Sequence, residues 1–154
     1  MTTNALRIVK AMGIQVETLE YQWSEDDLSA QAAAWKLKLD PDRVFKTIAL
    51  RGSGSGPFLC VVPGSTEVDL KKAALVSGNK SVEALALREL EPLTGYHRGG
   101  CSPVGTKKAL PVYVDETAML WETVSVSAGT RGLQMLIAPS DLALASGAVF
   151  ADLV

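Results

Sequence analysis

The stretch Val44-Phe45-Lys46-Thr47-Ile48-Ala49-Leu50 is rich in β-branched and aromatic residues, a composition typical of a β-strand. A glycine-serine segment at residues 51–57 and the apolar run Phe58 to Val62 follow, which together predict a hairpin with a flexible connection. Because side chains alternate across a strand, Lys46 shares a face with Val44, Ile48 and Leu50. If that face is buried, the ammonium group of Lys46 needs an anionic partner, since an unpaired charge in apolar surroundings is costly.

The remainder of the chain mixes helical and strand patterns without a regular strand-helix repeat. We expect helices from Ala5 to Met12, Ser29 to Leu37, Asp69 to Val76, Leu85 to Leu90 and Ser140 to Gly147, with Asn4, Asp69 and Ser140 as N-caps, and further strands from Ile14 to Leu19, Val112 to Val114, Thr123 to Ser127, Leu133 to Ile137 and Val149 to Leu153. This order predicts an α/β protein of the mixed α+β type, with a mixed sheet surrounded by helices in a single domain over residues 1–154.

Composition restricts the class of function. The chain has 154 residues, 47% hydrophobic and 21% charged, as expected for one globular domain. Its net charge of −2 argues against non-specific binding to nucleic-acid backbone but leaves a local basic patch open. Two cysteines without metal-ligand spacing, no secretory leader and no apolar run of about 18 residues predict a cytoplasmic protein with free thiols, no metal and no membrane partner.

Two glycine-rich segments, Arg98 to Gly105 and Ser127 to Gly132, are the other candidates for a binding site. Glycine lets the backbone approach a ligand closely, so amides from both segments, together with Lys46, could bind an oxyanion. The simpler interpretations also stand at this point. Lys46 could be an edge-strand lysine that discourages aggregation, and both segments could be ordinary connections.

Cys101 lies four residues after His97, the only histidine. A cysteine-histidine dyad would be a nucleophilic catalyst. No third residue that would orient the histidine is visible, however, and a lone cysteine is more often a packed side chain.

Several segments, taken in order, resemble the YbaK/ProX family of aminoacyl-tRNA deacylases, which are related to the editing domain inserted in bacterial prolyl-tRNA synthetases. They are Tyr21, Val44-Phe45-Lys46-Thr47, Val68-Asp69-Leu70-Lys71-Lys72, Leu93-Thr94-Gly95-Tyr96, residues 99–108 with the pattern Gly-Gly-x-Ser-Pro-x-Gly, and Val126-Ser127-Ala128-Gly129 leading into Arg131-Gly132-Leu133. The resemblance extends over nearly the whole chain. The glycine-serine-proline pattern and the Lys-Thr strand carry most of its specificity.

The resemblance implies a partly barrel-like sheet and a trans-editing enzyme that removes a wrong amino acid, most typically cysteine or another small residue, from proline tRNA. It implies Lys46 as the catalytic residue, without a cofactor. The substrate would contact Tyr21, Thr47, Gly99, Gly100, Cys101, Ser102, Ser127, Ala128 and Gly129. In the cysteine-specific branch the substrate's own thiol is thought to attack the ester. The implied partners are the 3′ end of aminoacyl-tRNA and, as a further option, prolyl-tRNA synthetase.

Two other classes of function remain open at the level of sequence. One is a non-catalytic module that binds tRNA, another nucleic acid or a synthetase. The other is a cysteine-dependent hydrolase built on Cys101. Gln134 bears on the substrate, because some relatives, including cysteine-specific ones, carry aspartate at the matching position.

Overall fold

The computed structural model describes residues 2–154. Its elements, in chain order, are α1 (Asn4–Ala11), β1 (Glu17–Glu20), α2 (Ala30–Leu37), β2 (Phe45–Gly52), β3 (Gly56–Pro63), α3 (Leu70–Ser77), β4 (Val82–Ala84), α4 (Leu87–Thr94), β5 (Val112–Asp115), the 3₁₀ helix η1 (Glu116–Leu120), β6 (Val124–Thr130), β7 (Leu133–Ile137), α5 (Pro139–Ser146) and β8 (Val149–Ala151). The predicted mixed α+β fold is confirmed.

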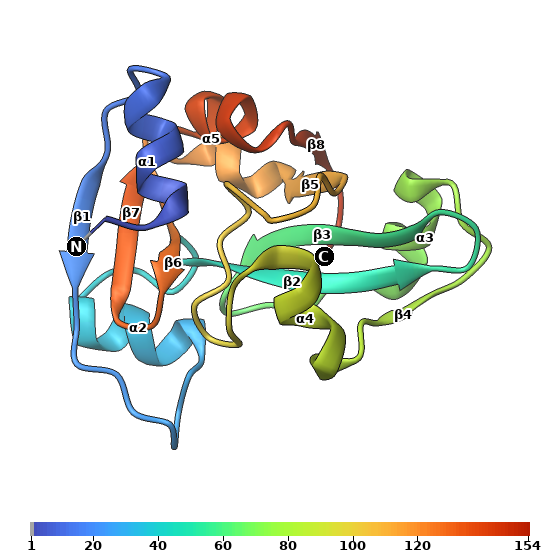
Figure 1. The fold of residues 1–154 in the computed structure, drawn as a ribbon, viewed down its shortest axis with the longest axis horizontal. Coiled ribbons are helices and arrows are strands. Elements are labelled where there is room, and N and C mark those ends of the chain that lie inside the picture. Colours follow the sequence, from blue (N-terminus) through green and yellow to red (C-terminus); the bar gives the residue numbers. More distant parts are fainter. Residues whose placement is uncertain (1) are drawn as a thin grey trace.

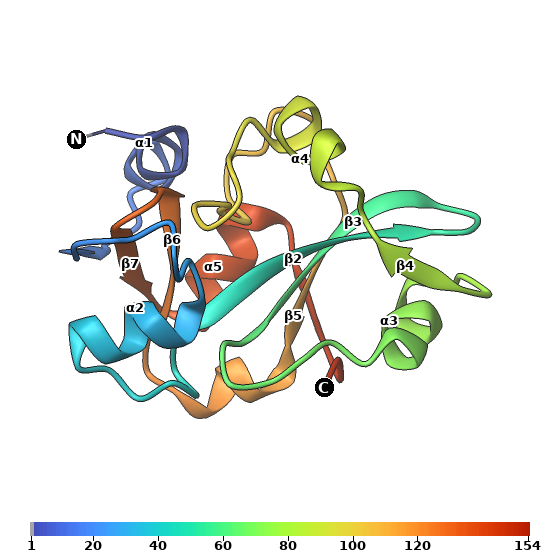
Figure 2. The same ribbon diagram turned by 90° about the horizontal axis from the view of Figure 1, so that it is seen from below.

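The strands form two sheets, visible as separate groups in Figures 1 and 2. A five-stranded sheet has the order β4-β2-β3-β5-β8, and a three-stranded antiparallel sheet has the order β1-β7-β6. The two meet where Val44, just before β2, forms a parallel bridge with Ser125 of β6. The strands of residues 2–154 form two sheets and do not close into a barrel.

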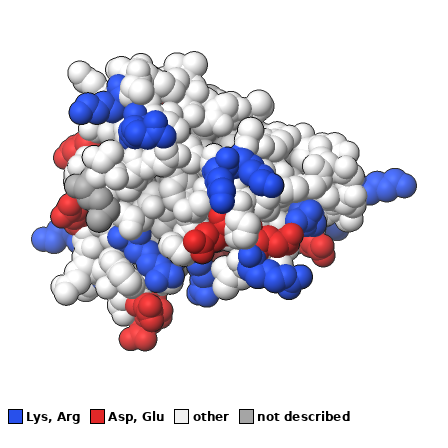
Figure 3. Space-filling model, viewed as in Figure 1, with Lys and Arg blue, Asp and Glu red and all other residues white. Residues whose placement is uncertain are grey.

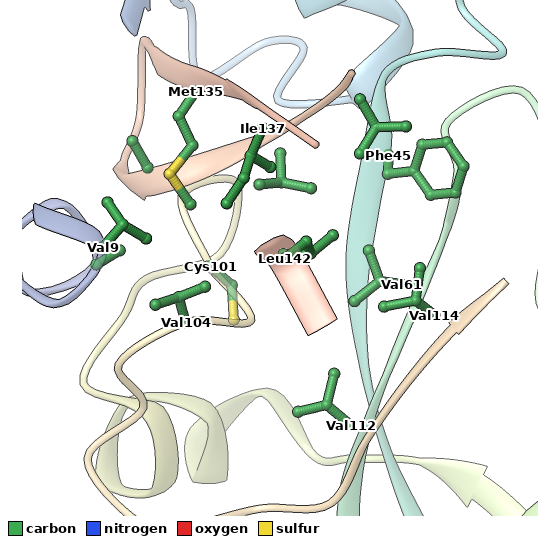
Figure 4. Packing of buried hydrophobic residues seen from close by; sticks show 14 of the residues in the cluster. Val9, Phe45, Val61, Cys101, Val104, Val112, Val114, Met135, Ile137 and Leu142 are labelled. Carbon is green, nitrogen blue, oxygen red and sulfur yellow. The ribbon is translucent and has the colours of Figure 1, made fainter. Parts of the chain in front are cut away.

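The β2–β3 hairpin provides the two longest strands of the larger sheet. It pairs from Phe45 opposite Pro63 to Gly52 opposite Gly56, and each of its faces is buried against a different apolar cluster. The larger cluster includes Phe45 and Val61 and extends under the three-stranded sheet, as Figure 4 shows. The smaller cluster includes Leu50 and Phe58. Lys46 is thus the second residue of a strand whose two faces pack against apolar clusters.

Most predicted elements are present, with shifted ends. Thr3 rather than Asn4 caps α1, because the Thr3 hydroxyl accepts a hydrogen bond from the Leu6 amide at 3.1 Å. Ser140 is not the N-cap of α5. That helix begins at Pro139, whose fixed φ suits a first helical position, after the uncapped Ala138. Residues 14–16 precede β1 instead of belonging to it.

Two elements were not predicted from the sequence. Strand β4 has only three residues and pairs with the end of β2, and η1 is a single short 3₁₀ segment held by the Asp115 side chain. The fourth helix was expected at Leu85–Leu90 but runs from Leu87 to Thr94 through Pro92. Across residues 2–154, no helix has the length and apolar composition needed to cross a lipid bilayer.

Candidate functional site

A cavity of about 380 Å³ lies where the two sheets meet. We call it the central cavity. It is lined by Tyr21, Glu25, Asp26, Asp27, Leu28, Ser29, Ala30, Ala33, Phe45, Lys46, Thr47, Ile48, Arg98, Gly99, Cys101, Ser127 and Gln134. Both glycine-rich segments and the Lys46 strand therefore contribute to one site. This agrees with the sequence-based hypothesis that they bind a common ligand.

Lys46 lies at this cavity with only 20% of its side chain exposed. Its Nζ atom is 3.2 Å from Oε1 of Glu67, whose side chain is 91% exposed, and donates a long hydrogen bond of 3.4 Å to the Gly64 carbonyl. The edge-strand interpretation does not fit, because the Lys46 side chain is mostly buried and β2 lies between β3 and β4, although β4 pairs with it only at residues 50–52. A largely buried ammonium group whose one ion-pair partner is an exposed surface carboxylate can exchange that partner for another anion.

Thr47 also lines the cavity. Its hydroxyl oxygen is buried and has no hydrogen-bond partner within the described residues. Buried polar groups are normally paired, so an unpaired hydroxyl beside a cavity is consistent with a group that is paired by a ligand.

The opposite side of the cavity comes from the three-stranded sheet and carries neutral polar groups. Gln134 of β7, 6% exposed, accepts a hydrogen bond of 2.9 Å from the hydroxyl of the fully buried Ser125. Burial raises the pKa of Tyr21, partly offset by hydrogen bonds with the Gly132 backbone and the Gln134 side chain. Tyr21 is thus a neutral phenol at physiological pH, and this wall adds polarity without charge.

The two glycine-rich segments touch each other directly. A Cβ atom on Gly100 would lie 2.7 Å from the Arg131 amide nitrogen and 2.8 Å from the Thr130 carbonyl carbon. The Arg131 guanidinium also donates through Nε to the Arg98 carbonyl at 2.8 Å. Gly99 adopts a φ of +86°, a conformation that favours glycine. The first segment is therefore held against the second by backbone contact that only glycine permits.

The sequence-predicted site residues fall into two groups. Lys46, Tyr21, Thr47, Gly99, Cys101 and Ser127 line the central cavity. Gly100, Ser102, Ala128 and Gly129 lie outside its lining.

Those four residues make contacts that hold the loops in shape. The Ala128 carbonyl accepts a hydrogen bond from the Thr3 hydroxyl, and the Gly129 amide donates to the Ser127 hydroxyl at 3.1 Å. The Ser102 hydroxyl accepts from the Val104 amide at 3.2 Å. A role for these residues as direct substrate contacts stays a prediction.

Cys101 and His97 do not form a catalytic pair. The Cys101 side chain lies within the larger apolar cluster, near Val104 in Figure 4, and burial raises its pKa to about 11. His97 is 70% exposed at its side chain, and its Nδ1 atom is 3.5 Å from the Glu91 carboxylate. A buried, protonated thiol without a neighbouring base is a poor nucleophile.

Several acidic residues at the cavity or paired with its lysine carried no clear signal in the sequence. Glu67 is an isolated acid before α3, and nothing in its spacing indicates a contact with Lys46. An acidic turn is most simply a solvated surface, yet the turn at Glu25, Asp26 and Asp27 borders the cavity. Within residues 2–154 no three His, Cys, Asp or Glu side chains are grouped as a metal site would require.

Comparison with known proteins identifies the family. A family model described as the aminoacyl-tRNA editing domain matches residues 25–144. The chain belongs to the aminoacyl-tRNA editing domain family. The matched range contains the Lys46 strand, both glycine-rich segments and most of the cavity lining.

Individual relatives agree with this assignment. The chain is 45% identical over 151 residues to EbsC of Enterococcus faecalis, which is named as a candidate Cys-tRNA(Pro)/Cys-tRNA(Cys) deacylase, and the match covers 98% of this chain and 92% of the relative. A crystal structure described as a candidate trans-editing enzyme for prolyl tRNA synthetase is 27% identical, with a TM-score of 0.81 and coverage of 99% and 98%. A hypothetical protein, APE2540, shares the fold at 24% identity, with a TM-score of 0.88 and coverage of 98% and 99%. The predicted family and its aminoacyl-tRNA deacylase activity are thereby confirmed.

Proposed function

We propose that this editing enzyme acts in trans on proline tRNA and removes cysteine or another small amino acid attached in error. The observation that carries the proposal is the position of Lys46, which borders the central cavity together with the uncharged polar groups of Tyr21, Thr47, Ser127 and Gln134. The 45% identity to a relative named for Cys-tRNA(Pro) and Cys-tRNA(Cys) supports the choice of substrate. The cavity volume of about 380 Å³ suits a small amino acid together with part of the terminal ribose.

In this proposal the protein positions the ester and stabilises charge. The Lys46 ammonium leaves Glu67 and turns to the anionic oxygen that develops on the ester carbonyl or to the terminal phosphate. Donors arranged in advance around a developing oxyanion are worth about 100- to 1,000-fold in rate. Tyr21, Thr47 and Ser127 supply neutral hydrogen-bonding groups around the aminoacyl moiety.

The attacking atom comes from the substrate or from water. With cysteine, the substrate thiol loses its proton and its sulfur bonds to the ester carbonyl carbon. The carbon–oxygen bond to the ribose then breaks, and the departing ribose oxygen takes up a proton. With an amino acid that lacks a thiol, a water molecule plays the same part. Neither route requires a nucleophile from the protein, which agrees with the inert setting of Cys101.

A deacylation panel tests this function. Proline tRNA charged with cysteine, alanine, serine or threonine is compared with correctly charged proline tRNA, using wild-type protein, Lys46→Ala and the exposed-lysine control Lys80→Ala. We expect selective release of a small amino acid, a loss of about 100-fold or more in kcat for Lys46→Ala, and wild-type rates for Lys80→Ala. An unchanged rate in Lys46→Ala, with the fold intact by circular dichroism, contradicts the assignment of Lys46.

We further propose that prolyl-tRNA synthetase helps to present the substrate. The net charge is −2, and the Lys and Arg side chains on the face in Figure 3 stand in separate groups instead of one continuous basic surface. Tight independent capture of tRNA is not expected from such a surface. Addition of the synthetase should lower the KM for mischarged tRNA. Binding of tRNA without turnover of any mischarged species would instead favour a non-catalytic binding module.

A further inference from the structure

An open groove of about 830 Å³ lies beside the central cavity. Its lining includes Tyr21, Trp23, Trp35, Lys36, Lys38 and Glu20, and we call it the tryptophan groove. Tyr21 lines both the groove and the central cavity, so the two hollows are neighbours at that residue. A ligand that fills the cavity and extends beyond it can therefore enter the groove.

The groove presents aromatic surface to solvent. Trp35, on α2, is 82% exposed, while α2 buries Ala33 and Ala34 on its inner side. Trp23 is 41% exposed, and the Arg131 guanidinium lies 5.3 Å from the centre of its ring. The chain has three tryptophans, and the two exposed ones line the same groove. An indole that is left this exposed offers a flat apolar face without a structural use.

The charges at the groove favour a polyanion on one side of the cavity. Lys36 donates to the Gln22 carbonyl at 2.7 Å, with its Nζ atom 6.0 Å from the centre of the Tyr21 ring, and Lys38 ends α2. Glu20 is the one carboxylate that lines the groove within the described residues. By contrast, the turn at residues 25–27 places three carboxylates on the cavity border. Arg131 lies 3.8 Å from the Glu25 carboxylate and Lys36 acts on Asp27, so two of these carboxylates are partly neutralised. Lys36 and Lys38 nevertheless make the groove the more favourable path for phosphates that leave the cavity.

We propose that the tryptophan groove binds the single-stranded 3′ end of the tRNA, with the base of a nucleotide preceding the terminal one stacked on Trp35 and its phosphates near Lys36 and Lys38. This inference rests on the proposed function, because the esterified terminal nucleoside is what occupies the central cavity. Single-stranded nucleic acids are commonly bound by aromatic stacking platforms combined with positive charge that follows the backbone. A protein partner is less well matched, since the groove combines two lysines with a stacking surface and joins the cavity that holds the ester.

The first test measures binding. The affinity of wild-type protein, Trp35→Ala and Leu75→Ala is determined for intact uncharged tRNA and for the same tRNA shortened by its unpaired 3′ nucleotides. Leu75, on α3, is also 82% exposed and is the matched control. We expect Trp35→Ala to weaken binding of intact tRNA by about 5- to 150-fold, the loss typical of one stacked base. Binding of the shortened tRNA should not change, and Leu75→Ala should match the wild type on both.

The second test measures turnover of cysteinyl-tRNA and of cysteinyl-adenosine, which has only the terminal nucleoside. Trp35→Ala should raise the KM for the tRNA with little change in kcat, because it removes binding that is uniform along the reaction. It should leave turnover of cysteinyl-adenosine as in the wild type. Equal losses on both substrates, or an unchanged KM for the tRNA, overturn the inference. So does a loss that appears with Arg98→Ala instead, since the strand would then leave along the first glycine-rich segment.

The outcomes separate this inference from the function on which it rests. A wild-type protein that deacylates mischarged tRNA while Trp35→Ala behaves identically refutes the tryptophan groove alone. A wild-type protein that binds intact tRNA through Trp35 but deacylates nothing refutes the editing function and leaves the groove assignment standing. Loss of synthetase binding in Trp35→Ala with unchanged tRNA affinity would show that the groove binds protein, and would overturn the inference.

Discussion

The two walls of the central cavity differ in charge and in how firmly they are held. The wall from β2 supplies Lys46, whose ammonium group is paired only with the exposed Glu67. The wall from the three-stranded sheet supplies neutral groups locked by buried hydrogen bonds, such as the one between Ser125 and Gln134. The charge is thus exchangeable while the shape is fixed. That division suits a site that must accept an anionic substrate and still discriminate by size.

A substitution at Gly100 would disrupt the contact between the two glycine-rich segments, which lies beside the neutral wall. Gly100→Ala would place a methyl group 2.7 Å from the Arg131 amide, and backbone atoms cannot rotate away. We expect the free energy of unfolding to fall by about 1–3 kcal/mol. Deacylation should fall by on the order of 10-fold or more, because displacement by about 1 Å in a site can cost about 100-fold. Thermal unfolding and kcat/KM measure the two effects.

Gly54→Ala is the matched control for that substitution. Gly54 lies in the β2–β3 turn, and the nearest atom to an added Cβ would be the Asn79 side-chain oxygen, at an ordinary contact distance of 3.4 Å. It should leave stability and activity close to wild type. Equal effects at both positions would show that the contact between the two glycine-rich segments is not what holds this wall.

The hydrogen bond between Ser125 and Gln134 tests how far the neutral wall depends on pairing. Gln134→Leu leaves the buried Ser125 hydroxyl without its acceptor and should lower the free energy of unfolding by about 1–3 kcal/mol. The double variant with Ser125→Ala should recover part of that loss, because removing both partners leaves no unpaired group. Chemical denaturation of the four proteins gives the coupling energy. Strictly additive losses of unfolding free energy would mean that this hydrogen bond contributes nothing to the stability of the wall.

The sequence predicted more of the fold than of the site's geometry. The alternation around Lys46 and the glycine-serine connection identified the β2–β3 hairpin, because strand patterning is local. The three-residue strand β4 was missed, since so short a segment has no period of its own and is defined by its pairing with β2. The cap of α1 shifted by one residue because Thr3 also donates to the Ala128 carbonyl, a contact between distant parts of the chain.

For the site, too, local sequence patterns were predictive and contacts between distant parts of the chain were not. Family motifs marked Lys46 and both glycine-rich segments, and these segments do meet at one cavity. Glu67 and the acidic turn at residues 25–27 were missed because their closeness to the cavity follows from tertiary packing and leaves no pattern along the chain. Trp35 lies in an alanine-rich helix, where a tryptophan is most simply a packing residue, but 82% of it is exposed. The buried face of α2 could not be inferred from its sequence, because four of its eight residues are alanines and the buried ones are Ala33 and Ala34.

Glu67 tests whether the charge on the β2 wall is exchangeable. Glu67→Gln removes the partner of the Lys46 ammonium, yet an ion pair with a 91% exposed carboxylate contributes little to folding. We expect the unfolding free energy to change by less than about 0.5 kcal/mol. The KM for mischarged tRNA should fall slightly at low salt and rise more steeply with salt, because the attraction between Lys46 and the substrate is no longer offset by a carboxylate. A large loss of stability or of kcat would instead make Glu67 a fixed part of the site.

The smallest change in turnover is expected at Cys101, which supplies neither the charge of the β2 wall nor the hydrogen bonds of the neutral wall. Cys101→Ser should keep kcat/KM within about twofold of wild type, whereas loss of a protein nucleophile costs several orders of magnitude. Cys60→Ser is the matched control, because Cys60 is also buried, its pKa is raised to about 12 by burial, and it does not line the central cavity. Both substitutions place a hydroxyl in apolar surroundings, so both should lower stability by similar amounts.

With a pKa of about 11, the Cys101 thiol should also resist alkylation by iodoacetamide at pH 7. Rapid alkylation that abolishes deacylation would instead support the hypothesis of a cysteine-dependent hydrolase, in which the protein and not the substrate supplies the nucleophile.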